Sequence, residues 1–144
     1  MAESTLFLLH LSATAYMTGI IWFVQLIHYP WFHDIPVNRF VAYHHKYTRI
    51  MGYVVGPAML IELITGILLL FALPMILGAF NVGLLVIIWV STFTIQIPCH
   101  HQLSRGYNLD VHQRLVQFNW IRTFAWSIRL VSLVAIRNLS HLND

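Results

Sequence analysis

The sequence predicts an all-α integral membrane protein, a single four-helix bundle, from three observations. Hydrophobic residues make up 58% of the 144 residues and charged residues only 9%, against roughly 45–50% and about 25% in soluble domains. Four apolar stretches each approach the roughly 20 residues that a helix needs to cross a bilayer. Two polar segments interrupt them. The predicted spans are residues 6–27, 53–73, 80–97 and 118–136, and the polar segments are 28–52 and 98–117.

The small number of charged side chains excludes several classes of protein. Eight basic and five acidic residues are too few to cover a soluble domain, so an ordinary soluble enzyme, a disordered chain and a nucleic-acid-binding domain are excluded. The single cysteine, Cys99, leaves no internal disulfide. The partners we expect are therefore the lipid bilayer and a hydrophobic small molecule, with no nucleic acid, and a homo-oligomer is left open.

The segments between the spans predict how the chain is oriented. The stretch 6–27 has no basic residues before it and no small-x-small cleavage site after it, so we interpret it as a mature span. The two polar segments lie on one side and hold five of the eight basic residues. The positive-inside rule places that side in the cytoplasm and both termini outside. Residues 36–51 predict a short helix, either interfacial or continuous with the second span, and Gly56-Pro57 predicts a kink.

A short internal similarity predicts two related halves. Ile20-Ile21-Trp22 recurs as Ile87-Ile88-Trp89, and Gln, Pro and His follow near each helix end. Two two-helix halves of equal orientation would be related by an axis along the membrane normal, an arrangement that tends to place a site between the halves. Duplication and chance similarity of common residues both remain open.

Seven of the nine histidines fall in or beside the polar segments. Because these ends converge in a four-helix bundle, the histidines predict a haem site or a single transition-metal site, iron or copper, near the cytoplasmic leaflet. The alternative is a set of solvated interfacial side chains. A ferritin-like di-iron site is excluded, since only one carboxylate lies within a span and no Glu-x-x-His occurs. The predicted ligands are His28, His44, His45, His100 and His101.

Glu62 lies near the middle of the second span, where a charge costs on the order of 3 kcal/mol and needs a partner. Arg122 and Arg129 share one face of the fourth span because they are seven residues apart. Arg129 is the deeper of the two and is the predicted counter-ion of Glu62. The pair is either an ion pair between helices or, together with Arg122, part of a site that relays protons or anchors an anion.

Two further residues are candidates for ligand contact. Arg49 follows His45 by four residues on one helical face, and its guanidinium can bind a carboxylate bidentately or reach lipid phosphates. Trp120 can stack on a planar ligand or anchor the helix at the interface. We interpret Asn119 and Gln96 as groups that join helices by hydrogen bonds.

The order of several motifs resembles the small four-helix HemJ-like protoporphyrinogen oxidases and their copper-resistance-domain relatives. The motifs are His10 and Trp22-Phe23 in the first span, and Tyr47-Thr48-Arg49-Ile50 before Gly56-Pro57-Ala58-Met59. The resemblance covers the first half of the chain. It implies haem binding and redox chemistry on a tetrapyrrole-like or quinone-like substrate, with roles for His10 and Arg49.

Three functions remain for such a chain. The first is a membrane oxidoreductase with a histidine-rich haem or metal site, in which Arg49, Glu62, Arg122 and Arg129 position a hydrophobic substrate or move protons. The second is a proton-coupled transporter with a relay through Glu62. The third is a non-catalytic membrane subunit or assembly factor, whose polar residues fasten helices together.

Overall fold

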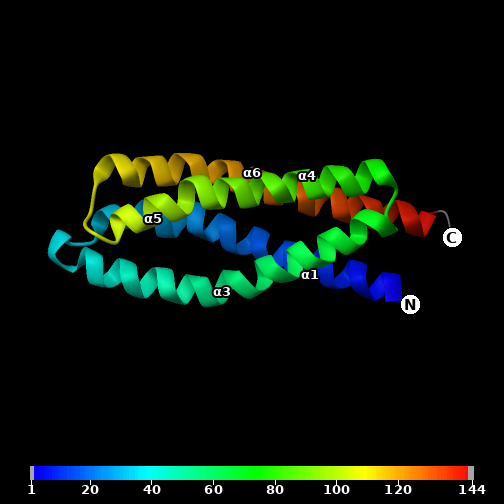
Figure 1. Ribbon diagram of the computed structural model, residues 1–144, viewed down its shortest axis with the longest axis horizontal. Helices are drawn as coiled ribbons and strands as arrows, with labels where there is room; N and C mark the ends of the chain where they lie inside the picture. Colours follow the sequence, from blue (N-terminus) through cyan, green and yellow to red (C-terminus); the bar gives the residue numbers. More distant parts are fainter. Residues whose placement is uncertain (1, 143–144) are drawn as a thin grey trace.

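Four long helical segments lie side by side and form one elongated bundle in the computed structural model, which describes residues 2–142 and the side chains of residues 4–138 (Figure 1). None of the described residues is in a strand. The first segment combines α1 (Ala2–Phe23), η1 (Val24–His28), α2 (Tyr29–Trp31) and η2 (Phe32–Asp34). The second is α3 (Val37–Ala72). The third combines α4 (Met75–Ser91), η3 (Thr92–Gln96) and α5 (Ile97–Leu103), and the fourth is α6 (Leu109–Leu142).

The connections divide the bundle into two ends. Both chain ends and the α3–α4 turn lie at one end, and the other two connections lie at the opposite end (Figure 1). We call this opposite end the histidine end. Most of the two predicted polar segments is helical. Residues 37–51 form the start of α3, so the alternative of a helix continuous with the second span is correct.

Prolines set the local geometry of three segments. Pro57 lies inside α3, which continues through it and bends in its middle (Figure 1). Pro30 and Pro98 each follow a π-helical turn, η1 and η3, by two residues. In these turns the Tyr29 and Ile97 amides donate to carbonyls five residues back. A proline lacks the amide that would continue the regular pattern. The turns recur in both halves, and duplication stays a prediction.

Three of the four segments are long and apolar enough to cross a membrane: Ser4–Asp34, Val37–Ala72 and Met75–Leu103. The predicted fourth span, 118–136, does not meet this standard because α6 carries Asn119, Arg122 and Arg129. These side chains are buried, whereas Phe124 and Val131 of the same helix are exposed. α6 therefore buries polar side chains and exposes apolar ones, the reverse of a surface helix on a water-soluble protein.

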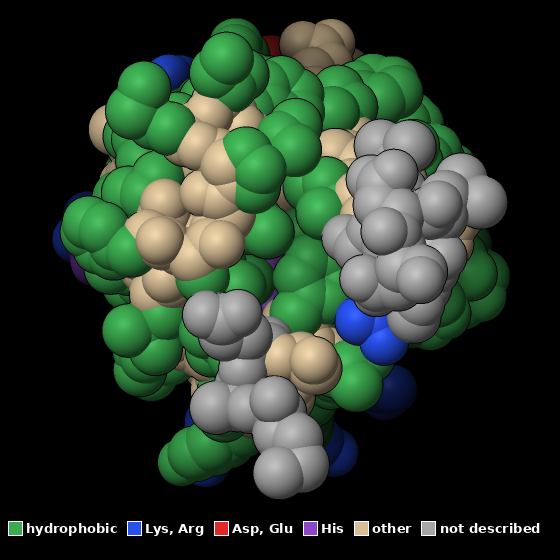
Figure 2. Space-filling model, turned by 90° about the vertical axis from the view of Figure 1, so that its right-hand side faces the viewer, with side chains coloured by type: hydrophobic (Ala, Val, Ile, Leu, Met, Phe, Trp, Pro, Cys, Tyr) green, Lys and Arg blue, Asp and Glu red, His purple; other side chains and the backbone are tan. Residues whose placement is uncertain are grey.

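The outer surface agrees with a lipid surrounding. Large hydrophobic side chains are exposed along all four segments. Seen from the end that carries the termini, hydrophobic side chains lie around much of the outline of the bundle (Figure 2). Together with the length of the helices, this indicates a membrane protein; the orientation of its termini stays a prediction.

Candidate functional site

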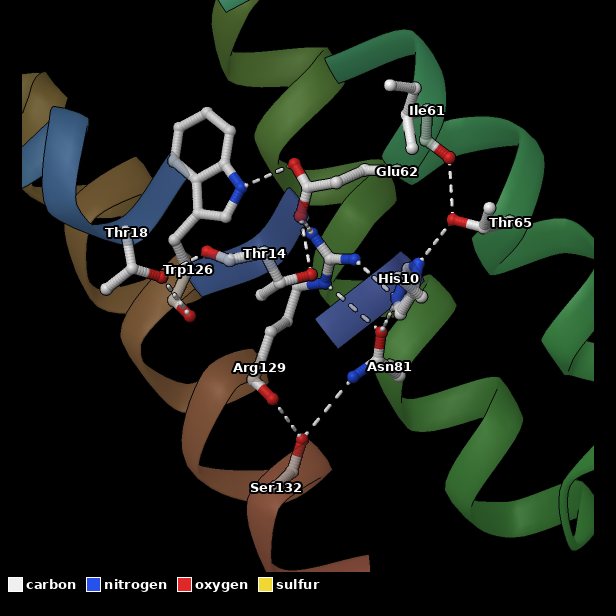
Figure 3. Close-up of polar contacts among 10 residues, drawn as sticks. All are labelled: His10, Thr14, Thr18, Ile61, Glu62, Thr65, Asn81, Trp126, Arg129 and Ser132. Carbon is white, nitrogen blue, oxygen red and sulfur yellow. Dashed lines mark hydrogen bonds and ion pairs between the residues drawn. The ribbon is translucent and has the colours of Figure 1, made fainter. Parts of the chain in front are cut away.

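The middle of the bundle holds a buried ion pair. Arg129 Nη1 on α6 donates to Glu62 Oε1 on α3 at 2.7 Å, and neither side chain is exposed. Thr14 Oγ1 of α1 donates to the same carboxylate at 2.8 Å, and Trp126 Nε1 donates to its other oxygen at 2.9 Å (Figure 3). The predicted pairing of Glu62 with Arg129 is confirmed.

The other nitrogens of Arg129 bear on which ring nitrogen of His10 carries the proton. Nη2 lies 3.2 Å from His10 Nε2 and Nε lies 3.2 Å from Asn81 Oδ1 (Figure 3). A guanidinium only donates, so towards Arg129 His10 Nε2 accepts and the proton resides on Nδ1; the longer 3.4 Å approach of Nε2 to Asn81 Oδ1 is then a contact between two acceptors. From Nδ1, His10 donates to Thr65 Oγ1 at 2.7 Å, and Thr65 donates in turn to the Ile61 carbonyl at 2.6 Å.

This network has the properties of a structural connection among helices. It joins α1, α3, α4 and α6, and its charges are paired and hydrogen-bonded on several sides, as buried charges must be. A small adjoining void is lined by His10, Gly66 and Asn81. A Cβ on Gly66 would lie 3.2 Å from the His10 ring and from Leu85, so a larger residue at this close approach would require these side chains to shift.

A second polar region borders a cavity of about 440 Å³ between α1, α3 and the η3–α5 segment. This volume lies within the ~300–1,000 Å³ range of small-molecule sites. Its walls are mostly apolar. They include Met17, Ile20, Ile21, Val24, Met51, Val55, Met59 and Ile97. Gly52, Ile97 and His101 line the cavity and are also exposed. The cavity therefore reaches the surface of the bundle between α3 and α5.

Two of the side chains that line this cavity hold a buried donor atom without a hydrogen-bond partner. The Arg122 and Gln96 side chains line it and are only 7% and 2% exposed. Among the described residues, Arg122 Nε and Gln96 Nε2 have no hydrogen-bond partner. Arg122 lies over the Trp126 ring, 5.2 Å from its centroid, and close to the Tyr29 phenol. Buried donors are rarely left unpaired, and Arg122 and Gln96 are therefore the side chains of the wall to which a bound molecule could bring an acceptor.

A chain of hydrogen bonds runs along the cavity wall at the histidine end. Ser104 Oγ donates its only hydrogen to the His100 carbonyl at 2.8 Å. Ser104 Oγ therefore accepts in its second bond, from His44 Nδ1 at 3.2 Å. A neutral His44 then accepts at Nε2 from His100 Nδ1, 3.0 Å away. His100 Nε2 accepts in turn from the Tyr29 hydroxyl at 3.0 Å. All four bonds have one direction, and Tyr29, His100 and Ser104 line the cavity.

His112 lies beside this chain of hydrogen bonds and has a structural role. Its Nε2 donates to the Tyr29 carbonyl at 2.6 Å, and its Nδ1 accepts from the Tyr107 hydroxyl at 3.0 Å. Burial, with a smaller contribution from the Asp34 carboxylate, raises the pKa of Tyr107. The phenol therefore stays protonated and available as the donor, and the loop between α5 and α6 is fastened to the backbone of the first segment.

The predicted histidine ligands do not converge. His45 and His101 are exposed, and His28 packs against the rings of Phe23 and Tyr47. Only His44 and His100 meet, and both ring nitrogens of each are hydrogen-bonded within the protein. No group of three or more His, Cys, Asp or Glu in the described part of the chain could hold a metal ion. Binding of a metal or haem through His44 or His100 would require breaking this hydrogen-bond chain, and the predicted haem or metal site stays a prediction.

The other predicted contacts lie apart from the cavity or join helices. Arg49 is exposed on α3, while Thr48 beside it lines the cavity. Trp120 packs on Trp22 and Phe124 and is not among the cavity walls. Asn119 donates to Gln25 Oε1 at 2.8 Å, which confirms its helix-joining role. By contrast, Gln96 accepts from Ser91 within its own segment.

Several residues of both sites were not predicted from the sequence. Tyr29 and Tyr47 line the cavity, and Thr65 and Asn81 complete the buried network. The Glu62/Thr65 spacing of three on one helical face was an available signal for Thr65. Tyr29 had no such signal, because the π turn before it changes which side chains face inward.

Comparison with models of protein families, with curated proteins and with solved structures finds no match for this chain.

Proposed function

We propose that this protein binds a lipid-soluble molecule with a hydrogen-bond-accepting head group in the cavity between α1, α3 and α5. The observation that carries the proposal is the pair of buried, incompletely satisfied donors, Arg122 Nε and Gln96 Nε2, at the wall of a mostly apolar cavity. The apolar wall suits an alkyl or isoprenoid chain. The exposed rim between α3 and α5 lets such a chain enter sideways from the lipid.

Gly52 allows the cavity to be blocked without disturbing the fold. It lies at the rim, and nothing is within 4 Å of a Cβ placed there. We expect Gly52→Phe to fill the opening and to lower ligand occupancy several-fold. Gly83→Phe on α4 is the matched control, because Gly83 is equally open and does not line the cavity.

The measurement uses an alkyl alcohol with a photoreactive diazirine in its chain, in lipid nanodiscs that contain the purified protein. Mass spectrometry locates the labelled residues. The proposal requires labelling of residues such as Met51, Val55 and Ile97 that excess unlabelled alcohol displaces. Labelling spread over the lipid-facing surface, or equal labelling of wild type and Gly52→Phe, would overturn it.

A second candidate is an oxidoreductase that acts on a hydroquinone-type molecule in this cavity. The chain from Tyr29 through His100 and His44 to Ser104 favours it, because Tyr29 lines the cavity and is hydrogen-bonded to a histidine that could take up a proton. Oxidation of a hydroquinone releases two protons and two electrons. The protons would leave through Tyr29, and the electrons need an acceptor, either a haem or another protein.

The transporter alternative has less support. An apolar layer that includes Met17, Ile21, Met59 and Ile88 separates the histidine end from the Glu62 network. A relay across the bilayer needs titratable groups along its whole length, and this layer supplies none.

Tyr29→Phe tests the redox candidate because it removes only the first hydroxyl of the chain. With a short-chain ubiquinol as substrate and ferricyanide as electron acceptor, we expect the initial rate to fall about 100-fold, as for loss of a general acid–base group. The exposed Tyr53→Phe is the control. Wild-type oxidation no faster than the protein-free reaction would overturn the candidate. A Soret band that shifts on dithionite reduction would identify a haem acceptor, and a featureless spectrum of folded protein would exclude haem.

A further inference from the structure

We infer that the head group bound in the cavity is an oxyanion, a carboxylate or phosphate on an alkyl chain, and that it serves as the missing counter-ion of Arg122. This inference rests on the proposed function and adds the charge of the ligand. It follows from a comparison of two arginines on the same helix.

Arg122 and Arg129 lie seven residues apart on α6, two turns along one face, and both are buried. Arg129 has a built-in counter-ion, since Glu62 lies 2.7 Å away. Arg122 has none among the described residues, whose only two ion pairs are His33–Asp34 and Glu62–Arg129. A charge removed from water needs compensation, and the phenol of Tyr29 and the face of Trp126 supply only partial charge.

The position of Arg122 lets a ligand supply that compensation. Its side chain lines the cavity, and its Nε has no hydrogen-bond partner. Gln96 Nε2, a second buried donor without a partner, belongs to the same wall. A guanidinium binds carboxylates and phosphates through parallel hydrogen bonds. No acidic side chain is among the residues that line this cavity, so an anion would meet no repulsion there.

The apolar wall defines the rest of the molecule. It continues inward to Met17 and Met59, beside the apolar layer of the bundle, and outward to Gly52 and Ile97 at the rim. A single alkyl chain attached to the oxyanion would occupy this wall. The ligand class is therefore an acidic amphiphile, such as a fatty-acid anion or an alkyl phosphate.

The experiment compares two photoreactive diazirine probes of equal chain length in nanodiscs, one a carboxylic acid and one the corresponding primary alcohol. We expect wild type to bind the acid about tenfold or more tightly than the alcohol, since charge-assisted hydrogen bonds are roughly twice as strong as neutral ones. Arg122→Gln is expected to abolish this preference and keep labelling by the alcohol. Arg122→Lys keeps the charge and should retain a smaller preference.

Arg114→Gln is the matched control, an exposed arginine of the same helix. Unlabelled alkyl carboxylate and alkyl phosphate compete in separate arms, and displacement by either one supports the inference and identifies the oxyanion. If wild type labels equally with acid and alcohol, or if Arg122→Gln keeps the preference, the oxyanion inference is wrong while the cavity remains a ligand site. If neither probe labels the cavity saturably, the proposed function fails as well.

Discussion

Glu62→Leu is expected to lower the free energy of unfolding by about 3–5 kcal/mol, because it leaves the Arg129 guanidinium buried without a counter-charge. Neither side chain is exposed, so no solvent can replace the lost carboxylate. Thr14 and Trp126 also lose their acceptor. Unfolding of the purified protein by SDS in mixed micelles, followed by tryptophan fluorescence and circular dichroism, measures the change.

The double variant Glu62→Leu/Arg129→Met separates the net contribution of the ion pair to stability from the cost of burying one of its charges alone. Replacing a buried ion pair by apolar groups of similar size is often nearly neutral, so we expect it to recover more than half of the lost stability. Asp110→Asn, an exposed acid in the first turn of α6, should behave as wild type. A double variant as unstable as the sum of the two single variants would show that the pair is not coupled.

Phe32→Ala is expected to destabilise the protein by about 3–5 kcal/mol, the usual cost of truncating a fully buried phenylalanine. Phe32 has no exposed surface, and its ring lies 5.0 Å from that of Tyr47 and 5.6 Å from that of His44. The same variant should weaken ligand binding in the cavity, because the Phe32 ring packs against the rings of Tyr29 and His44.

Trp31→Ala is the adjacent control. The Trp31 side chain is larger but 62% exposed, so its removal takes little packing from the bundle. Thermal denaturation in detergent compares the two variants. Equal loss of stability in both would mean that the 3₁₀ turn at this end, not the ring of Phe32, holds the helices together.

The sequence predicted the parts of this protein that membrane energetics determines directly. Long apolar stretches must become helices, since no other open structure satisfies the backbone in lipid. The pairing of Glu62 with Arg129 was predictable for the same reason, because a charge at that depth needs a partner and α6 offered few. The fourth span was predicted from its apolar residues, and its buried polar residues are the reason why it falls below the hydropathy of the other three segments.

The cavity and the buried network were less predictable because they depend on register. In a regular helix His10 and His28, eighteen residues apart, lie on one face. The π turn η1 contains His28 and shifts the register of the helix after it, and Tyr29, the next residue, faces the interior and is only 3% exposed. The same kind of turn at η3 precedes His100. The convergence of the helix ends was therefore not enough to predict which histidines meet, and only His44 and His100 do.

The inverted polarity of α6 constrains how the protein is made. Each arginine near the centre of a span opposes entry into lipid by about 2.5–3.5 kcal/mol, and α6 carries two that are buried. The first three segments can partition into the bilayer on their own hydropathy, with the Glu62 carboxyl inside. We expect α6 to enter the bilayer only together with α3, because the Glu62 carboxylate neutralises the Arg129 guanidinium.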